Sequence, residues 1–358
     1  MNVVKIGKKS VGDGFPVFVI AEAGCNHNSD IELAKRLVDC AKTAAADIVK
    51  FQTYHAELMY SRKTPIMAHF RERMGLGDDA TMFDLIKATE LPYELHPAIV
   101  RHCDKRKIMF ASTPFDEDSV DFLEQFDPPV YKIASFEMVH YPLIRKVART
   151  KKPVILSTGM SSLGDIEKAL SVIHQEQNDK VILLHCVSNY PAVPEDYNLR
   201  VIETLKKAFN TPVGISDHTP GIETALIAVA AGANIVEKHI TVDQSLPGPD
   251  HHFSLDPKQL NQLVSGVNRV SSMLGTNIKQ CLDSEMNMKH IGRRSLVAAI
   301  DIRHGETLSE RHIAIKRPGY GIHPEFLEML MGKESIVDIE VDTPLTWEMF
   351  LSGSSSGS

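Results

Sequence analysis

Short apolar segments alternate with longer segments of helical periodicity along most of the chain. Eight of the apolar segments are nearly continuous in apolar character, which is typical of strands buried on both faces of a parallel sheet. Helices must then cover those faces. The eight predicted strands are 17–22, 47–51, 108–112, 130–134, 154–157, 181–185, 213–216 and 235–239.

The segments between these strands have the spacing of amphipathic helices. The first opens at Ser29-Asp30, a good N-cap, and carries apolar residues at positions 31, 34, 37, 38 and 41. Eight strand–helix units in succession predict an α/β fold, a (β/α)8 barrel. A doubly wound open sheet is the competing fold, but no Gly-rich dinucleotide motif follows the first strand. The other predicted helices are 97–107, 119–126, 143–150, 164–174, 202–209 and 222–231.

Every predicted strand ends in polar or ionisable residues. In a (β/α)8 barrel the catalytic groups lie at the C-terminal ends of the strands, so these residues should line one pocket. A single serine or lysine after a strand is usually only a turn residue, but eight polar ends in register favour a shared active site. In strand order they are Glu22, Lys50 with Gln52, Ser112 with Thr113, Lys132 with Ser135 and Glu137, Ser157 with Thr158, Ser188 with Tyr190, His218, and His239.

His218 and His239 end the last two strands, which are neighbours in a barrel, and so could converge on one metal ion. Two imidazoles without thiolates leave coordination positions for water and substrate, which suits Mn²⁺, Mg²⁺ or Co²⁺ better than a closed zinc site. Asp217 and Glu237 are candidates to orient the imidazoles. The alternative is that each histidine is only hydrogen-bonded at the barrel mouth.

Lys50 and Lys132 are two cations at the same predicted end of the barrel. A lysine there can bind phosphate as a point charge or form a Schiff base with a carbonyl substrate. Hydroxyl groups on neighbouring strands favour a site that holds a phosphate and a carboxylate together. A class I aldolase with Lys132 as the imine-forming residue is the rival enzyme class, and lysines that merely extend to solvent are the third alternative. The hydroxyl groups belong to Thr113, Ser135, Ser157 and Ser216.

Composition narrows the range of partners. The 358 residues carry a formal net charge of −7, which argues against a nucleic-acid partner. Five cysteines without C-x-x-C spacing are typical of reduced thiols in a cytosolic protein. No segment approaches the length of a membrane span, and the first residues do not resemble a signal peptide. We therefore expect a cytoplasmic protein that binds small molecules and no membrane.

The last part of the chain differs in pattern from the barrel. A polar segment precedes short apolar segments, Gly-containing turns and one short predicted helix near 324–331. A module of this size is marginally stable alone, so it should pack against the barrel or a partner subunit. We expect a barrel domain over 1–280, a linker over 281–292, a β-rich domain over 293–351 and a flexible Gly/Ser tail over 352–358.

The order and spacing of short motifs resemble those of the sialic acid (nonulosonic acid) synthases, including N-acetylneuraminate synthase. The resemblance spans almost the whole chain, from Lys5 to Phe350. It implies a barrel followed by an SAF domain similar to type III antifreeze proteins. It also implies a domain-swapped homodimer in which the small domain caps the partner's active site. The motifs include IAEAGCNHN, VKFQTY, STPFD, YKIASFE, LSTGM, LHCVSNYPA, GISDHT, EKHITVD, GPDHHFSLDP, RRSLVA and KRPGYGI.

Such synthases condense phosphoenolpyruvate with an N-acetylated hexose and water and release phosphate. By this resemblance His218 and His239 match the metal ligands, with Mn²⁺ the expected ion, and Glu22 matches the catalytic carboxylate. Arg317 matches a catalytic, sugar-binding arginine that the partner subunit donates. The phosphoenolpyruvate site matches Lys50, Thr113, Lys132, Ser135, Ser157, Ser188 and Ser216. The other sugar contacts match Gln52, Glu137, Tyr190 and Asp250.

Two departures leave the hexose acceptor open. Some relatives carry asparagine where this chain has Ser188, and some N-acetylneuraminate synthases have phenylalanine in the segment that here reads Ile291-Gly292-Arg293-Arg294. RRSLVA and YKIASFE also resemble legionaminic and pseudaminic acid synthases and spore-coat relatives. N-acetylmannosamine is the acceptor that we favour from the sequence, with the hexoses of those synthases as alternatives. A non-enzymatic carbohydrate- or ice-binding protein is a further rival, but the eight polar strand ends argue against it.

Overall fold

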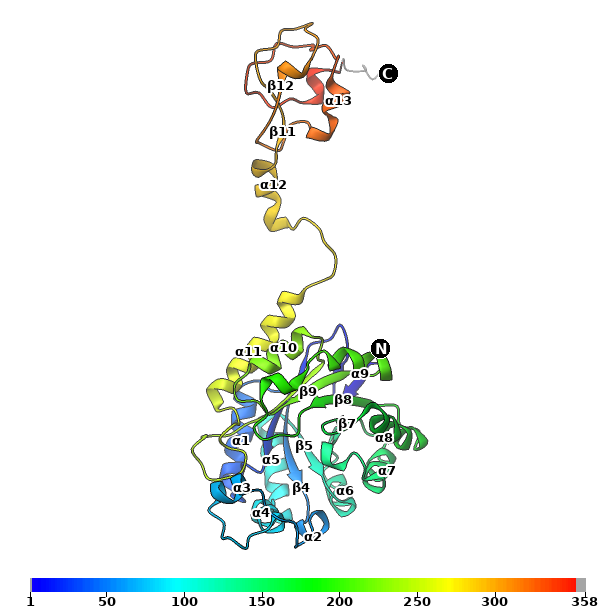
Figure 1. The fold of residues 1–358 in the computed structure, drawn as a ribbon, viewed down its shortest axis with the longest axis vertical. Coiled ribbons are helices and arrows are strands. Elements are labelled where there is room, and N and C mark those ends of the chain that lie inside the picture. Colours follow the sequence, from blue (N-terminus) through cyan, green and yellow to red (C-terminus); the bar gives the residue numbers. More distant parts are fainter. Residues whose placement is uncertain (1, 352–358) are drawn as a thin grey trace. The chain divides into compact units, whose positions relative to one another are not determined.

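The computed structural model describes residues 2–351 (Figure 1). The expected Gly/Ser tail at 352–358 lies outside the described residues. The chain divides into two compact units, of which the first ends at Gly275 and the second begins at Thr276. Among the described residues, no helix has both the length and the apolar character that crossing a bilayer requires.

Eight parallel strands form the sheet of the first unit. Their order is β5-β4-β3-β10-β9-β8-β7-β6, and β5 and β6 lie beside each other, which closes the sheet into a barrel. The predicted (β/α)8 fold is therefore confirmed. The strands are β3 (Phe18–Gly24), β4 (Ile48–Thr53), β5 (Met109–Pro114), β6 (Tyr131–Ile133), β7 (Val154–Ser157), β8 (Val181–Cys186), β9 (Val213–Asp217) and β10 (Ile235–His239).

Helices cover the outside of the barrel (Figure 1). The first begins where its N-cap predicts, because the Asp30 carboxylate accepts hydrogen bonds from the backbone N–H groups of Glu32 and Leu33. The sequence did not predict the last helix, which Asp256 caps through a reciprocal contact with Gln259. The helices are α1 (Ile31–Thr43), α5 (His96–Arg106), α6 (Glu117–Glu124), α7 (Tyr141–Arg149), α8 (Leu163–Gln175), α9 (Val201–Phe209), α10 (Glu223–Ala230) and α11 (Pro257–Leu274).

A small hairpin precedes the barrel and closes its N-terminal end. Strands β1 (Val4–Ile6) and β2 (Lys9–Val11) pair antiparallel. Their side chains join the apolar cluster inside the barrel, which includes Ile20, Ile155 and Ile235. The hairpin therefore covers the N-terminal end of the barrel interior, opposite the end at which the strands terminate.

The connection between β4 and α5 is long and carries helices of its own. It contains α2 (Ala56–Met59), α3 (Ala68–Met74) and α4 (Met82–Thr89), followed by a 3-10 turn over Tyr93–Leu95. Phe70, Met82 and Leu85 form a separate small core within it. We call residues 55–90 the excursion.

The second unit is a small β-rich module. Strands β11 (Ser295–Ala298) and β12 (Ile313–Lys316) pair antiparallel. A helix, α12 (Met286–Gly292), forms inside the segment that was predicted to be a linker. The short helix predicted near 324–331 consists of a 3-10 turn over Pro324–Phe326 and α13 (Leu327–Leu330). The core of this unit includes Leu296, Ile302, Leu308, Leu330 and Leu345.

Candidate active site

A pocket of about 400 Å³ lies at the carboxyl ends of the barrel strands. Its floor is polar and its upper side, contributed mainly by the excursion, is apolar. Glu137 is not among the residues that line it. It collects most of the residues that the sequence singled out: Glu22, Lys50, Gln52, Thr113, Lys132, Ser135, Ser157, Ser188, Tyr190, Ser216, His218, His239 and Asp250.

The alternation of side chains along the strands decides which residues face this pocket. Glu237 pairs in register with Ser216, and Lys238 pairs in register with Asp217. Because neighbouring residues in a strand point to opposite faces, the first pair enters the barrel and the second faces the helices. The Ser216 hydroxyl donates a 2.8 Å hydrogen bond to Glu237.

Two buried lysines and two buried carboxylates form the pocket floor. Lys50 Nζ lies 2.6 Å from Glu22 Oε2 and 3.6 Å from Glu237 Oε2. Lys132 Nζ lies 3.3 Å from Glu237 Oε1. The four groups have no formal net charge when all are ionised. From the sequence, Glu237 was predicted only to orient an imidazole. Its position two residues before His239, however, puts both side chains on the same face of the strand.

The two carboxylates differ in acidity. Burial, together with the nearby Glu237 charge and against the pull of Lys50, raises the pKa of Glu22 to about 7. Glu237 is also buried, but Lys132, Lys50 and the Ser216 hydroxyl stabilise its charged form and lower its pKa to about 2. Burial lowers the pKa of Lys132. Glu22 is therefore the carboxylate that can gain or lose a proton near neutral pH.

Hydroxyl groups ring the two lysines. Lys50 Nζ donates a 2.9 Å hydrogen bond to the Thr113 hydroxyl, and the Gly159 N–H donates one of 2.9 Å to the Ser135 hydroxyl. The hydroxyl oxygens of Ser157 and Ser188 are buried and have no hydrogen-bond partner among the described residues. Because buried polar groups are rarely left unpaired, these two atoms indicate a polar ligand.

Glycine is required at one point of this ring. A Cβ atom at Gly159 would come within 2.3 Å of the Ser188 hydroxyl and 2.9 Å of the Ser135 hydroxyl. Only a residue without a side chain lets the backbone after β7 approach these serines so closely. The LSTGM motif therefore contributes Ser157 to the pocket and a backbone N–H group that holds the Ser135 hydroxyl.

The imidazoles of His218 and His239 face each other with ring centroids 5.4 Å apart. His218 Nδ1 donates a 3.0 Å hydrogen bond to the carbonyl oxygen of Val187, so in the neutral form of this ring Nε2 carries the lone pair. Tyr190 packs against His218 at 4.3 Å between ring centroids. Burial and the neighbouring His218 keep the pKa of His239 well below its usual range, so this ring is neutral.

These residues fit a metal ion with an open coordination shell. His239 Nδ1 is buried without a hydrogen-bond partner among the described residues, and Asp250 Oδ2 lies 3.5 Å from it. No group of three or more His, Cys, Asp or Glu side chains arranged for a metal is found in the part of the chain that the structure describes. The two imidazoles would thus hold an ion only with oxygen ligands from water or substrate.

Asp217 takes a different part from the one expected. It does not turn toward His218 but lies 2.7 Å from Lys238 Nζ, outside the barrel, and accepts hydrogen bonds from Thr219. The residue that holds this strand end is Tyr197. Its hydroxyl donates to the Ser216 carbonyl at 2.9 Å and accepts from the His218 N–H at 2.7 Å.

The predicted sugar-binding residues are spread more widely. Gln52 donates a 3.2 Å hydrogen bond to Glu22. Burial and the charge of Asp116 raise the pKa of Glu137 to about 7. Arg317 belongs to the second unit, is exposed, and donates through Nε to the Gly292 carbonyl at 2.8 Å.

Comparison with known proteins adds a family to this geometry. Residues 37–279 match the NeuB family and residues 293–351 match the SAF domain. The chain is 40% identical over 317 residues to the N,N'-diacetyllegionaminic acid synthase of Campylobacter jejuni, covering 88% of this chain and 94% of that protein. The family match thus runs from within α1 to the end of the barrel domain, and the SAF match covers the module.

Two solved structures have the same fold. The N-acetylneuraminic acid synthetase of Leptospira borgpetersenii is 37% identical with a TM-score of 0.70, over 80% of this chain and 94% of that one. The spore coat polysaccharide biosynthesis protein spsE of Bacillus subtilis is 36% identical with a TM-score of 0.67, over 99% of this chain and 100% of that one. The similarity therefore includes the module as well as the barrel.

Proposed function

Because this chain belongs to the NeuB family of nonulosonic acid synthases and ends in an SAF domain, we propose that it condenses phosphoenolpyruvate with an N-acetylated hexose and water. The products would be a nine-carbon sialic-type acid and phosphate. The observation that carries the proposal is the polar floor, where Lys50 and Lys132 lie among hydroxyl groups, two of which have no hydrogen-bond partner among the described residues.

Phosphoenolpyruvate fits this floor because it carries two anionic groups close together. Lys50 and Lys132 offset the charges of its phosphate and carboxylate. Ser157 and Ser188 donate hydrogen bonds to its oxygens and so lose their unpaired state. Thr113, Ser135 and Ser216 complete the ring of donors.

The chemistry requires two bonds to form at the enolpyruvate. Its nucleophilic C3 attacks the aldehyde carbon of the sugar, and water adds to C2, after which phosphate leaves. His218 and His239 would hold a divalent ion, Mn²⁺ first among the candidates, which when bound polarises the sugar's carbonyl oxygen. Glu22, in its ionised form, orients the water and removes its proton.

The acceptor lies between this floor and the apolar side of the pocket. Gln52, Tyr190 and Asp250 line the pocket at positions suited to sugar hydroxyl groups. Burial and the charge of Glu137 raise the pKa of Tyr60, which also lines the pocket. N-acetylmannosamine is the acceptor that the sequence favours. We include in the proposal a domain-swapped dimer in which Arg317 of one subunit reaches the acceptor in the other, because an arginine can donate several hydrogen bonds to oxygens or an amide.

A phosphate-release assay tests the function. The protein is mixed with phosphoenolpyruvate, Mn²⁺ and, in turn, N-acetylmannosamine, mannose, and the two di-N-acetylated 6-deoxyhexoses that lead to legionaminic and pseudaminic acids. Phosphate should appear only with an N-acetylated acceptor, together with a nine-carbon acid. Failure with the whole panel, for folded and metal-loaded protein, would contradict the proposal.

A second assay separates this reaction from that of a class I aldolase. The lowered pKa of Lys132 is the observation that favours the class I aldolase, because a neutral amine is needed to form an imine. Borohydride reduction with pyruvate should leave Lys132 unmodified by mass spectrometry. A reduced adduct at Lys132 would favour the aldolase.

A further inference from the structure

The candidate active site has one side that phosphoenolpyruvate cannot use. Opposite the charged floor, the excursion lines the pocket mainly with apolar side chains, and the polar groups among these residues are the side-chain hydroxyls of Tyr60 and Thr89. No charged residue of the excursion lines the pocket among the described residues. We call this surface the apolar wall, and its residues are Met59, Tyr60, Met67, Phe70, Met82, Leu85 and Ile86.

The apolar wall is a built surface with its own support. Phe70, Met82 and Leu85 are buried and pack together as the core of the excursion, with Ile66 and Met74 beside them. Helix α4 begins at a reciprocal contact between Thr81 and Asp84. By contrast, Met59 and Ile86 are only half-buried while they line the pocket. The surface that these two side chains present is therefore open to a ligand.

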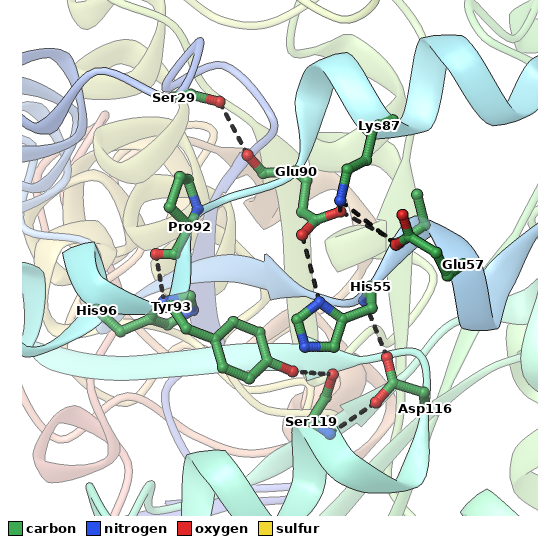
Figure 2. Close-up of polar contacts among 11 residues, drawn as sticks. Ser29, His55, Glu57, Lys87, Glu90, Pro92, Tyr93, His96, Asp116 and Ser119 are labelled. Atoms are coloured by element: carbon green, nitrogen blue, oxygen red, sulfur yellow. Dashed lines mark hydrogen bonds and ion pairs between the residues drawn. The ribbon is translucent and has the colours of Figure 1, made fainter.

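One carboxylate fixes where the wall stands. Figure 2 shows Glu90 between His55 and Lys87, at the point where the two ends of the excursion meet. Its carboxylate accepts hydrogen bonds from His55 Nδ1 at 3.3 Å, from the Ala56 N–H at 3.2 Å and from Lys87 Nζ at 3.0 Å. The wall therefore does not depend on the ligand for its position.

The backbone of His55 is tied in turn to the next strand. Its N–H donates a 3.1 Å hydrogen bond to Asp116, which also caps α6 after β5 (Figure 2). We call the place where the two ends of the excursion meet, around His55 and Glu90, the neck. The hydroxyl groups of Tyr54 and Thr89 form a 3.1 Å hydrogen bond across it. Because β5 also carries Thr113 of the floor, the wall and the floor are held at a fixed separation.

A wall of this kind selects against hydroxyl groups. A hydroxyl that is pressed against methionine and isoleucine loses its water without gaining a hydrogen bond, whereas a methyl or acetyl group gains contact. A single methylene in such a subsite changes kcat/KM by roughly 10- to 200-fold. N-acetylmannosamine carries hydroxyl groups at C4 and C6, while a di-N-acetylated 6-deoxyhexose carries an acetamido group and a methyl group in those places.

We infer that the apolar wall is a subsite for an apolar substituent of the acceptor, so that a di-N-acetylated 6-deoxyhexose is used in preference to N-acetylmannosamine. This inference rests on the proposed function and reverses the order of acceptors that the sequence favoured. Met59 and Ile86 are the specificity-determining residues, because they are the half-buried side chains of α2 and α4 on this surface.

The test compares kcat/KM for the two acceptors at saturating phosphoenolpyruvate in the full-length protein. The wild type should prefer the di-N-acetylated 6-deoxyhexose by about tenfold or more. Met59→Gln adds polarity at nearly constant side-chain size, Ile86→Thr adds a hydroxyl group and shortens the side chain, and each should reduce that preference by about tenfold. KM for phosphoenolpyruvate should not change. Ile227→Thr, on the exposed surface of α10, is the matched control and should leave the preference intact.

Each other result has a separate meaning. Activity with neither acceptor would refute the proposed function itself. Activity with a wild-type preference for N-acetylmannosamine would refute the subsite alone. An equal loss with both acceptors in the Met59 and Ile86 variants, accompanied by a change of oligomeric state in light scattering, would assign the wall to a partner subunit and overturn the inference.

Discussion

The ammonium group of Lys50 lies 2.6 Å from the carboxylate of Glu22, and both side chains are buried at the floor of the pocket. Lys132 and Glu237 complete this group of charges. An anion that binds here would add negative charge to a group whose two lysines and two carboxylates cancel when all are ionised, and it would repel the two carboxylates. Glu22 is the group prepared to respond, since its pKa is already raised to about 7 by burial.

Phosphoenolpyruvate binding should therefore take up protons. The bound anion raises the pKa of Glu22 further, so the complex holds more protons than the free protein, and affinity should fall as the pH rises above about 7. The number of protons taken up on binding is measured by calorimetry of the metal-free protein in buffers of different ionisation enthalpy. Glu22→Gln should reduce the uptake, and an unchanged value would exclude Glu22 as its source.

Either histidine of the proposed metal pair should be essential for turnover and dispensable for folding. His218→Ala and His239→Ala should remove activity, since residues at a barrel mouth carry chemistry more than packing. Circular dichroism and the melting temperature should stay near the wild-type values. His102→Ala, on α5 and 2.8 Å from Asp39, is the control. Chelation should inactivate the protein until Mn²⁺ is restored, and full activity after exhaustive chelation would rule out a metal.

Tyr197→Phe should weaken metal binding without removing the fold. The lost hydroxyl bridges the Ser216 carbonyl and the His218 N–H, so the end of β9 loses the contact that orients His218. We expect metal affinity to fall by about 10- to 100-fold, the usual effect of losing a group that orients a ligand. Manganese titration by electron paramagnetic resonance measures it, and excess Mn²⁺ should rescue turnover.

Tyr131→Phe is the matched control for this change. Tyr131 is equally buried, and its hydroxyl donates a 2.7 Å hydrogen bond to Glu124 on the helical layer. It should lower the melting temperature and leave manganese affinity unchanged. Equal losses of affinity in the two variants would mean that Tyr197 acts only through stability.

Arg317→Ala and His239→Ala subunits should complement each other. If Arg317 serves the other subunit's site, a mixed dimer has one site with both groups intact, and mixing two inactive proteins should restore part of the activity. Arg317→Ala alone should weaken acceptor binding and leave phosphoenolpyruvate binding nearly unchanged. Subunit exchange is verified by native mass spectrometry. Exchange without recovery would place the arginine's action in its own chain or remove it from the reaction.

The sequence predicted the barrel and its polar strand ends because both depend on local patterns. A buried strand needs a short apolar run, and the residue that follows it must lie at the sheet edge, so Lys50 and His239 could be placed without coordinates. To predict which face of the sheet each side chain of a strand points to, the alternation of side chains along the pleated strand must also be considered. Asp217 and Glu237 each lie close to a histidine in sequence. Glu237 lies two residues before His239 and so shares its face of the strand, whereas Asp217 lies next to His218 and points to the opposite face.

The excursion could not be predicted because its stability is not local. Helix α2 has 4 residues and α3 has 7, too short to be recognised from periodicity or to be stable in isolation. Helix α3 is stabilised because its Phe70 packs against Met82 and Leu85 of α4, which come together only in the folded chain. The carboxylate of Glu90, which joins the two ends, is likewise 35 residues away from His55 in sequence.

The neck at Glu90 makes the excursion resemble an exchangeable cassette. Its two ends already stand side by side, so a replacement segment of another length would meet the same anchors, and the entropic cost of closing a loop grows only slowly with length. Descendants of one ancestral gene could thus acquire new sugar preferences by altering this stretch while the anion-binding floor stayed the same. Laboratory chimeras that transplant residues 57–88 offer the same route to redesigned acceptor choice.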